Sequence, residues 1–198
     1  MRELAPARLL NLFSYTCSFS VAAAAGGAHT TSVDLSARAL ARGRDNFTLN
    51  GLDPAAHRFE KADVLDWLGR ARRRKERFDL VVLDPPSFGT RGRRATFSVS
   101  KSYVALVRDA LSLLAPGGRL LAITHHLKTS RAALRRVLHD AAREARVELR
   151  RIEDLPSGLD CPDWPGGPAP SRSVLATLAP GRAPREAGRH TSAKRIRK

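Results

Sequence analysis

The residues best placed for chemistry follow a short apolar run, LVVL at 80–83, which stops at Asp84-Pro85-Pro86. A continuous apolar run ended by a breaker is typical of a strand buried on both faces. Proline ends the strand because it cannot donate a hydrogen bond to the ladder. The Asp84 carboxylate and two rigid prolines should therefore lie at the carboxyl end of a central strand, where open α/β sheets bind ligands. The alternative is an ordinary Asp-Pro turn leaving a strand.

Polar side chains also follow other expected strands, namely Asn11 with the turn after it, Asp34 and Asp63. Doubly wound folds hold a ribose through a carboxylate about 20 residues beyond the first strand-turn-helix. Asp34 lies 23 residues beyond Asn11 and fits that spacing. Asp63 would then reach the adenine amine of the same nucleoside. The alternative for Asp34 is a helix N-terminal acid just before Ser36, stabilised by the helix dipole.

The first turn indicates which kind of nucleoside cofactor would bind. It contains Ser14, Thr16 and Ser18, and no glycine occurs before Gly26. A pyrophosphate needs close approach to the backbone, which glycine permits and side chains hinder. The turn therefore disfavours NAD and favours a nucleoside without phosphates, S-adenosylmethionine.

Strands and helices are expected to alternate along the chain. Strands are expected at 8–13, 29–33, 57–61, 80–83, 119–124, 147–152 and 173–178, and helices at 19–25, 37–49, 64–77, 103–114 and 130–145. Pro116-Gly117-Gly118 is expected to end the fourth helix. This alternation predicts one α/β domain, residues 1–180, with a mostly parallel sheet and helices on both faces. Residues 181–198, basic and almost without apolar side chains, are expected to form a disordered tail.

Composition points to a polyanionic partner. The chain of 198 residues has 35 Lys and Arg against 19 Asp and Glu, a net charge of +16. A charge this large favours nucleic acid, bound through 70–77, 91–94 and 181–198; an Arg-rich composition without such a role is the alternative. Two distant cysteines give neither a disulfide framework nor zinc spacing, so no metal is expected. No apolar run is long enough for a membrane span, and no signal peptide is seen, so a cytoplasmic protein is the default.

Four stretches together carry a resemblance to a known family. LNLFSYTCSFSVAAAAGGA, TSVDLS, LDPPSF and LLAPGGRLLA resemble the class I S-adenosylmethionine-dependent methyltransferases close to the ribosomal RNA large-subunit cytosine-5 methyltransferases. The likeness covers roughly residues 9–178 and implies a seven-stranded, Rossmann-like methyltransferase fold. It implies that Phe13–Thr16 line the methionine end of the cofactor, Asp34 holds the ribose, Asp63 holds the adenine, and Asp84-Pro85-Pro86 faces the target base. The cofactor contacts it implies are Asn11, Phe13, Ser14, Tyr15, Thr16, Asp34, Leu35, Asp63, Val64 and Asp84.

The chain departs from that family at its cysteines. Cys17 stands where the family usually has glycine, and a side chain there would crowd the cofactor loop. The family's cytosine chemistry uses a cysteine after the fifth strand, where this chain has His125-His126. Carbon-5 of cytosine is not nucleophilic until a thiolate adds to C6. The family's Asp-His-Pro reads Asp160-Cys161-Pro162, so Cys161 is either a displaced nucleophile or incidental.

Other features leave several functions open. The two histidines could contact RNA, act as a base or be surface residues. Phe88 could stack on an extruded base or belong to the core. Family members carry an RNA-binding module and a linking subdomain ahead of the catalytic domain, whereas the first strand here is expected from Arg8.

The first hypothesis is an enzyme that transfers a methyl group from S-adenosylmethionine to a base in RNA, with ribosomal RNA as the expected substrate. The alternatives are a basic RNA-binding protein that keeps the methyltransferase fold without catalysis, and a methyltransferase acting on an exocyclic amine or ring nitrogen.

Overall fold

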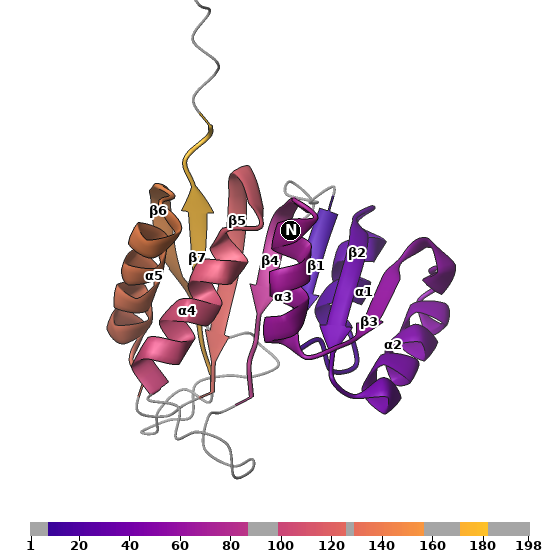
Figure 1. The fold of residues 1–198 in the computed structure, drawn as a ribbon. Helices are drawn as coiled ribbons and strands as arrows, with labels where there is room; N and C mark the ends of the chain where they lie inside the picture. Colours follow the sequence, from indigo (N-terminus) through magenta and orange to yellow (C-terminus); the bar gives the residue numbers. More distant parts are fainter. Residues whose placement is uncertain (1–7, 87–98, 126–128, 157–170, 182–198) are drawn as a thin grey trace, which may run out of the picture.

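A seven-stranded sheet forms the middle of the protein. The computed structural model describes residues 8–86, 99–125, 129–156 and 171–181. The strand order is β3-β2-β1-β4-β5-β7-β6 (Figure 1). The strands are β1 (Arg8–Leu12), β2 (His29–Asp34), β3 (Arg58–Lys61), β4 (Phe78–Leu83), β5 (Leu114–Thr124), β6 (Leu149–Leu155) and β7 (Arg172–Leu178). β7 runs antiparallel to both β5 and β6, and the other neighbouring pairs are parallel. The predicted mostly parallel, seven-stranded sheet is confirmed.

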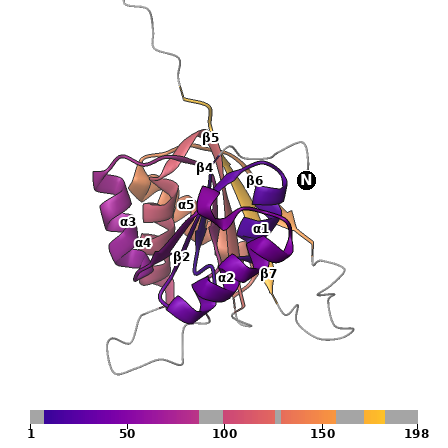
Figure 2. The ribbon, with the colours of Figure 1, turned by 90° about the vertical axis from the view of Figure 1, so that its right-hand side faces the viewer.

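Helices cover both faces of this sheet. α1 (Ser18–Ala25) and α2 (Ala37–Leu49) pack on one face, and α3 (Val64–Arg73), α4 (Val99–Leu111) and α5 (Arg131–Ala145) pack on the other; a short 3-10 helix, η2 (Pro54–Ala56), precedes β3 (Figure 2). This layering is the Rossmann-like arrangement expected for a class I methyltransferase.

β4 is buried on both faces, as its continuous apolar run predicts. Val81 and Leu83 belong to the large core beneath α3, α4 and α5, whereas Val82 packs with Leu9 and Ile123 on the other face. Proline then stops the ladder. Asp84 therefore follows a strand whose position is fixed by packing on both sides.

The Pro-Gly-Gly segment differs from its predicted role. α4 ends at Leu111, and residues 116–118 lie inside β5 rather than at the helix end. The register between β4 and β5 shifts there, with Phe78 opposite Leu114 and Leu80 opposite Arg119. A step of five residues on β5 thus matches a step of two on β4, which is an enlarged bulge. Gly117 has φ +73° there, so the glycine serves the bulge in the strand.

Parallel strands bring their carboxyl ends to one edge, the lower edge in Figure 1. The segments that follow β1, β2, β3, β4 and β5 therefore meet there, although they are far apart in sequence. The polar residues that were expected at strand ends thus belong to a single edge of the sheet.

Candidate functional site

The loop after β1 is held in an uncommon backbone conformation. Phe13, Tyr15 and Cys17 have φ of 58°, 44° and 65°, the left-handed region that side chains disfavour. Such residues cost of order 1–3 kcal/mol each and persist only where the surroundings fix them. They concentrate at ligand sites, so this loop is the first part of a candidate site.

Hydrogen bonds from neighbouring elements fix that loop. The Ser14 N–H donates to the Val33 carbonyl at 3.0 Å. The Asn46 side-chain amide on α2 donates to the Thr16 carbonyl at 2.9 Å. The loop is therefore anchored to β2 and α2, which explains how three non-glycine residues keep positive φ.

Asp34 joins the loop to the next helix. Its Oδ2 accepts from the Tyr15 N–H at 2.9 Å, and its Oδ1 accepts from the Ser36 N–H at 2.8 Å. Ser36 in turn caps α2 by accepting from the Ala39 N–H at 3.2 Å. Asp34 therefore also has the alternative role expected from the sequence, that of an acid at the N-terminus of a helix, because it accepts from the N–H of the residue that caps α2. Each carboxylate oxygen keeps a further lone pair, so Asp34 can still accept from a ligand hydroxyl.

Large apolar side chains are exposed around these strand ends. Tyr15 is 71% exposed, Leu35 67% and Leu65 46%. Tyr15 follows β1, Leu35 follows β2 and Leu65 follows β3, so these side chains offer apolar walls at the strand ends for a flat, partly apolar ligand such as an adenine ring. Sequence reasoning does not single out Leu65, because its position in the first turn of an amphipathic helix gives no signal of exposure.

Asp63 is the N-cap of α3. Its Oδ1 accepts from the Leu65 N–H at 2.8 Å and from the Asp66 N–H at 3.2 Å. Val64 is buried in the core, so its side chain does not face the edge. Asp63 itself is exposed, and its second carboxylate oxygen is available to a ligand donor.

Asn11 points inward. It is 1% exposed, and its Nδ2 donates to Ser20 Oγ at 3.0 Å on α1. Ser20 Oγ lies 2.7 Å from Ser32 Oγ on β2. The reason is strand alternation, which turns the residue before Leu12 toward α1. Asn11 therefore ties β1 to α1 beneath the loop, and its side chain is not among those brought to the open edge.

Cys17 also points inward. Its side chain is fully buried with Leu40 and Phe47, and a Cβ built on Gly43 of α2 would lie 2.5 Å from its sulfur. Burial raises the pKa of the thiol. The Cys17 side chain was expected to crowd the loop. It points instead toward α2, where Gly43 has no side chain and leaves space for the sulfur.

Asp84 lies against His125, a pairing that the sequence alone does not show. Oδ1 of Asp84, directly after β4, lies 2.9 Å from Nε2 of His125, directly after β5. Burial raises the pKa of the Asp84 carboxyl, and His125 partly offsets that rise. Pro85 is buried and Pro86 exposed. The Tyr103 hydroxyl of α4 donates to the Ile123 carbonyl of β5 at 3.4 Å.

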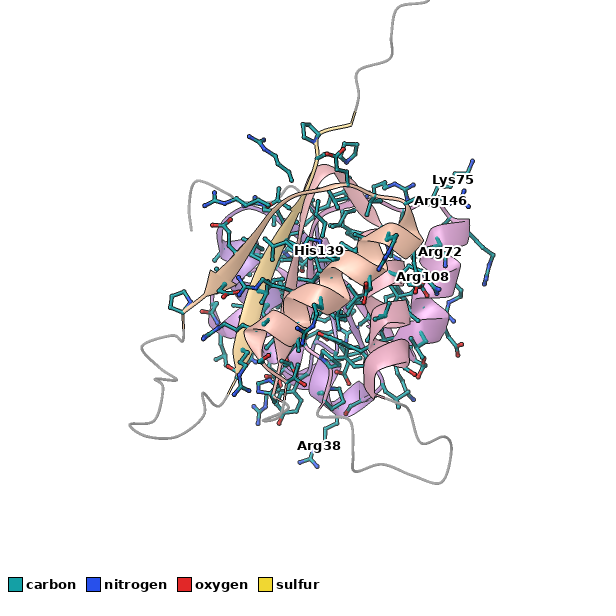
Figure 3. The ribbon with its side chains drawn as sticks, turned by 90° about the vertical axis from the view of Figure 1, so that its left-hand side faces the viewer. Arg38, Arg72, Lys75, Arg108, His139 and Arg146 are labelled. Carbon is teal, nitrogen blue, oxygen red and sulfur yellow. The ribbon has the colours of Figure 1, made fainter. Side chains whose placement is uncertain are left out.

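The basic run at 70–77 lies at the other edge of the sheet. α3 starts at the carboxyl edge of the sheet, after β3, and its chain returns to the amino edge, where β4 starts at Phe78. The basic run forms the end of α3 and the turn into β4, so it lies at the amino edge. Glu76 within it pairs with Arg58 at 2.9 Å and with Arg74 at 3.6 Å. Figure 3 shows the side chains gathered near this end: Arg72, Lys75, Arg108 and Arg146. This run cannot contact a base that faces Asp84.

Several predicted features fall outside the described residues. They are Ser87, Phe88, 91–94, His126, Cys161 and 182–198. Among the residues that are described, no group of three or more metal-ligating side chains is close enough to hold an ion. None of the helices in the described ranges is both long and apolar enough to cross a membrane.

The fold and the strand-end residues define a nucleoside-binding protein of the doubly wound α/β class. Residues 1–175 match the family described as S-adenosylmethionine-dependent methyltransferase, and the chain belongs to that family.

Similar proteins support the same assignment. The chain is 39% identical over 148 residues to "Putative ribosomal RNA large subunit methyltransferase YwbD" of Bacillus subtilis, which covers 74% of this chain and 37% of the relative. It is 40% identical over 167 residues to ribosomal RNA large subunit methyltransferase K/L of Chromohalobacter salexigens, covering 83% of this chain and 21% of the relative. The chain thus spans well under half of each of these relatives.

A solved structure shares the fold and contains a cofactor product. The "Crystal structure of SMU.776, a putative methyltransferase complexed with SAH" matches with a TM-score of 0.71 and 35% identity. The match covers 86% of this chain and 44% of that chain. A related protein of this fold thus binds the demethylated cofactor.

Proposed function

We propose that this chain is the catalytic domain of an enzyme that transfers a methyl group from S-adenosylmethionine to a base in RNA, specifically ribosomal RNA. One observation carries the proposal. The strained loop held by Asp34 and the Asp84-Pro85-Pro86 segment follow β1 and β4, which are adjacent parallel strands. A cofactor on the loop would thus be beside a base at Asp84. The relatives named as ribosomal RNA methyltransferases support the substrate.

The residues at the edge fit this cofactor. Asp34 would accept from the ribose hydroxyls with the lone pairs that Tyr15 and Ser36 leave unused. Tyr15 and Leu35, both mostly exposed, would flank the adenosine. Asp63 would accept from the adenine amine. The bound cofactor supplies a methyl group on a sulfonium, which is electrophilic.

On the target side, Pro85 and Pro86 would form a rigid wall for the base, and Asp84 would orient it. The buried Pro85 fixes the direction of the segment, because proline restricts both its own φ and the residue before it. Basic residues would bind RNA phosphates, which gives affinity without sequence information. We expect the domain to act in the cytoplasm, where bacterial ribosomal RNA is made.

The experiment is calorimetric titration of the full chain with S-adenosylmethionine, followed by transfer of radiolabelled methyl to large-subunit ribosomal RNA transcribed in vitro. Micromolar binding and incorporation into RNA are expected. Asp34→Ala should lose cofactor binding at a temperature where circular dichroism shows it folded. An RNA-binding protein without catalysis would instead retain RNA affinity and fail to bind millimolar cofactor, which would overturn the proposal.

A further inference from the structure

The contact between Asp84 and His125 has the geometry of a carboxylate that orients a base. The two residues are 41 positions apart, and each is the first residue beyond its strand. β4 and β5 are parallel neighbours with Leu83 opposite Ala122. Because packing fixes both strands, the sheet brings these two residues side by side, and their Oδ1 and Nε2 atoms lie 2.9 Å apart.

This contact also determines which ring nitrogen is free to react. An ionised Asp84 accepts from an Nε2–H, so the proton of the neutral imidazole is on Nε2 and Nδ1 carries the lone pair. Nδ1 makes no hydrogen bond to any of the described residues. The His125 side chain is 46% exposed and that of Asp84 is 26% exposed, so the basic nitrogen can reach a ligand while the carboxylate stays sheltered.

We propose that His125 accepts a proton from the nitrogen that is methylated, with Asp84 as its positioning residue. This inference rests on the proposed function and specifies its substrate class: a base nitrogen that carries hydrogen, such as an exocyclic amine. The nitrogen forms a bond to the methyl carbon, and the carbon–sulfur bond breaks with its electron pair left on sulfur. The nitrogen becomes cationic and its proton passes to Nδ1 of His125, which later releases it to water.

Carbon-5 methylation of cytosine would require a thiolate that adds to C6. Within the described ranges the cysteine is Cys17, which is fully buried against α2 and whose thiol has a raised pKa. Cys17 therefore cannot reach a base at Asp84. Cys161 lies outside the described residues, so Cys161→Ser is included in the test.

The test uses the full chain, radiolabelled S-adenosylmethionine and large-subunit ribosomal RNA transcribed in vitro, in single turnover. His125→Gln keeps an N–H that can donate to Asp84 but offers no basic nitrogen. General-base catalysis contributes about 10²–10⁴-fold, so the methyl-transfer rate should fall at least about 100-fold. The cofactor dissociation constant should stay within about twofold, since the cofactor residues are unchanged.

Two controls separate proton transfer from a structural role. His139→Gln makes the same change at an exposed position on α5 and should leave the rate unchanged (Figure 3). His125→Ala should regain activity when imidazole is added to the buffer, which a structural defect would not do. Nucleoside analysis by mass spectrometry should place the methyl on a nitrogen that has lost hydrogen.

The outcomes are distinguishable. A wild-type chain that methylates RNA while His125→Gln keeps its rate would overturn the inference and leave the proposed function standing. The same holds if the product is methylated on carbon, if Cys161→Ser abolishes transfer, or if the methylated nitrogen carried no hydrogen. A wild-type chain that transfers no methyl to the RNA would overturn both.

Discussion

The sulfur of Cys17 occupies the space that a side chain at Gly43 would need. A Cβ on Gly43 would lie 2.5 Å from Sγ and 3.1 Å from Cβ of Cys17. The two residues come from the loop after β1 and from α2, and they fit only as a pair. A bulkier residue in the loop is thus matched by the absence of a side chain in the helix that packs against it.

Gly43→Ala should therefore destabilise the protein. Alanine usually stabilises an exposed helix interior by about 1 kcal/mol over glycine. Here overpacking should reverse the sign and cost about 1–3 kcal/mol. The measurement is the free energy of unfolding in urea. Cys17→Gly should rescue Gly43→Ala in a double-mutant cycle, because glycine removes the sulfur and tolerates the φ of 65°. Equal costs of Gly43→Ala in both backgrounds would contradict the pairing.

Asp63 should have two separable roles. Asp63→Ala removes the N-cap of α3 and should cost about 1 kcal/mol of stability. Asp63→Ser keeps a capping oxygen and should retain most of that stability. Both variants lack the carboxylate that we propose accepts from adenine, so both should weaken S-adenosylmethionine binding in calorimetry. If the serine variant binds the cofactor normally, Asp63 serves the helix alone.

Ionisation of the Asp84 carboxyl should lower the free energy of unfolding of the protein. Burial raises its folded-state pKa above the usual value of 3.8, so the folded state holds the proton more tightly than the unfolded state. Stability from this group is therefore present below pH 3.8 and is lost as the pH rises through the raised pKa. Asp84→Asn should be the more stable form by about pH 5.5, and its advantage should shrink toward about pH 3.5.

Urea unfolding of both proteins between about pH 3.5 and 5.5 measures this difference. The asparagine variant should also lose methyl transfer, because a neutral amide gives His125 a weaker hydrogen bond than the charged carboxylate does. An advantage that is constant over this pH range would show that the pKa of Asp84 is unchanged on folding.

The basic run at 70–77 should affect RNA affinity and not the chemical step. Arg73 and Lys75 are exposed at the amino edge of the sheet. Changing both to Gln should raise KM for RNA and leave kcat unchanged. The slope of log affinity against log salt should fall by about 0.7–0.9 for each phosphate that the variant no longer neutralises. A fall in kcat at saturating RNA would instead place this run near the reacting base.

The local sequence determined much of the scaffold. Apolar runs ended by Asp or Pro predicted β4 and its neighbours, because burial on both faces requires continuous apolar residues. Ser36 and Ser130 marked where α2 and α5 begin, since each side chain accepts from a backbone N–H of the first turn. Acidic residues at strand ends predicted Asp34 and Asp63 at a common edge, because parallel strands end on the same side.

The tertiary structure decided what those residues contact. Strand order made β4 and β5 neighbours, and this pairing brings Asp84 and His125 together across 41 residues. The side chains of Asn11 and Cys17 point inward, a direction that residue type alone does not reveal. The Pro-Gly-Gly segment became a bulge, since its conformation depends on the register with β4. Sequence patterns report local preference and burial, whereas contacts between distant residues arise only when the strands pack side by side.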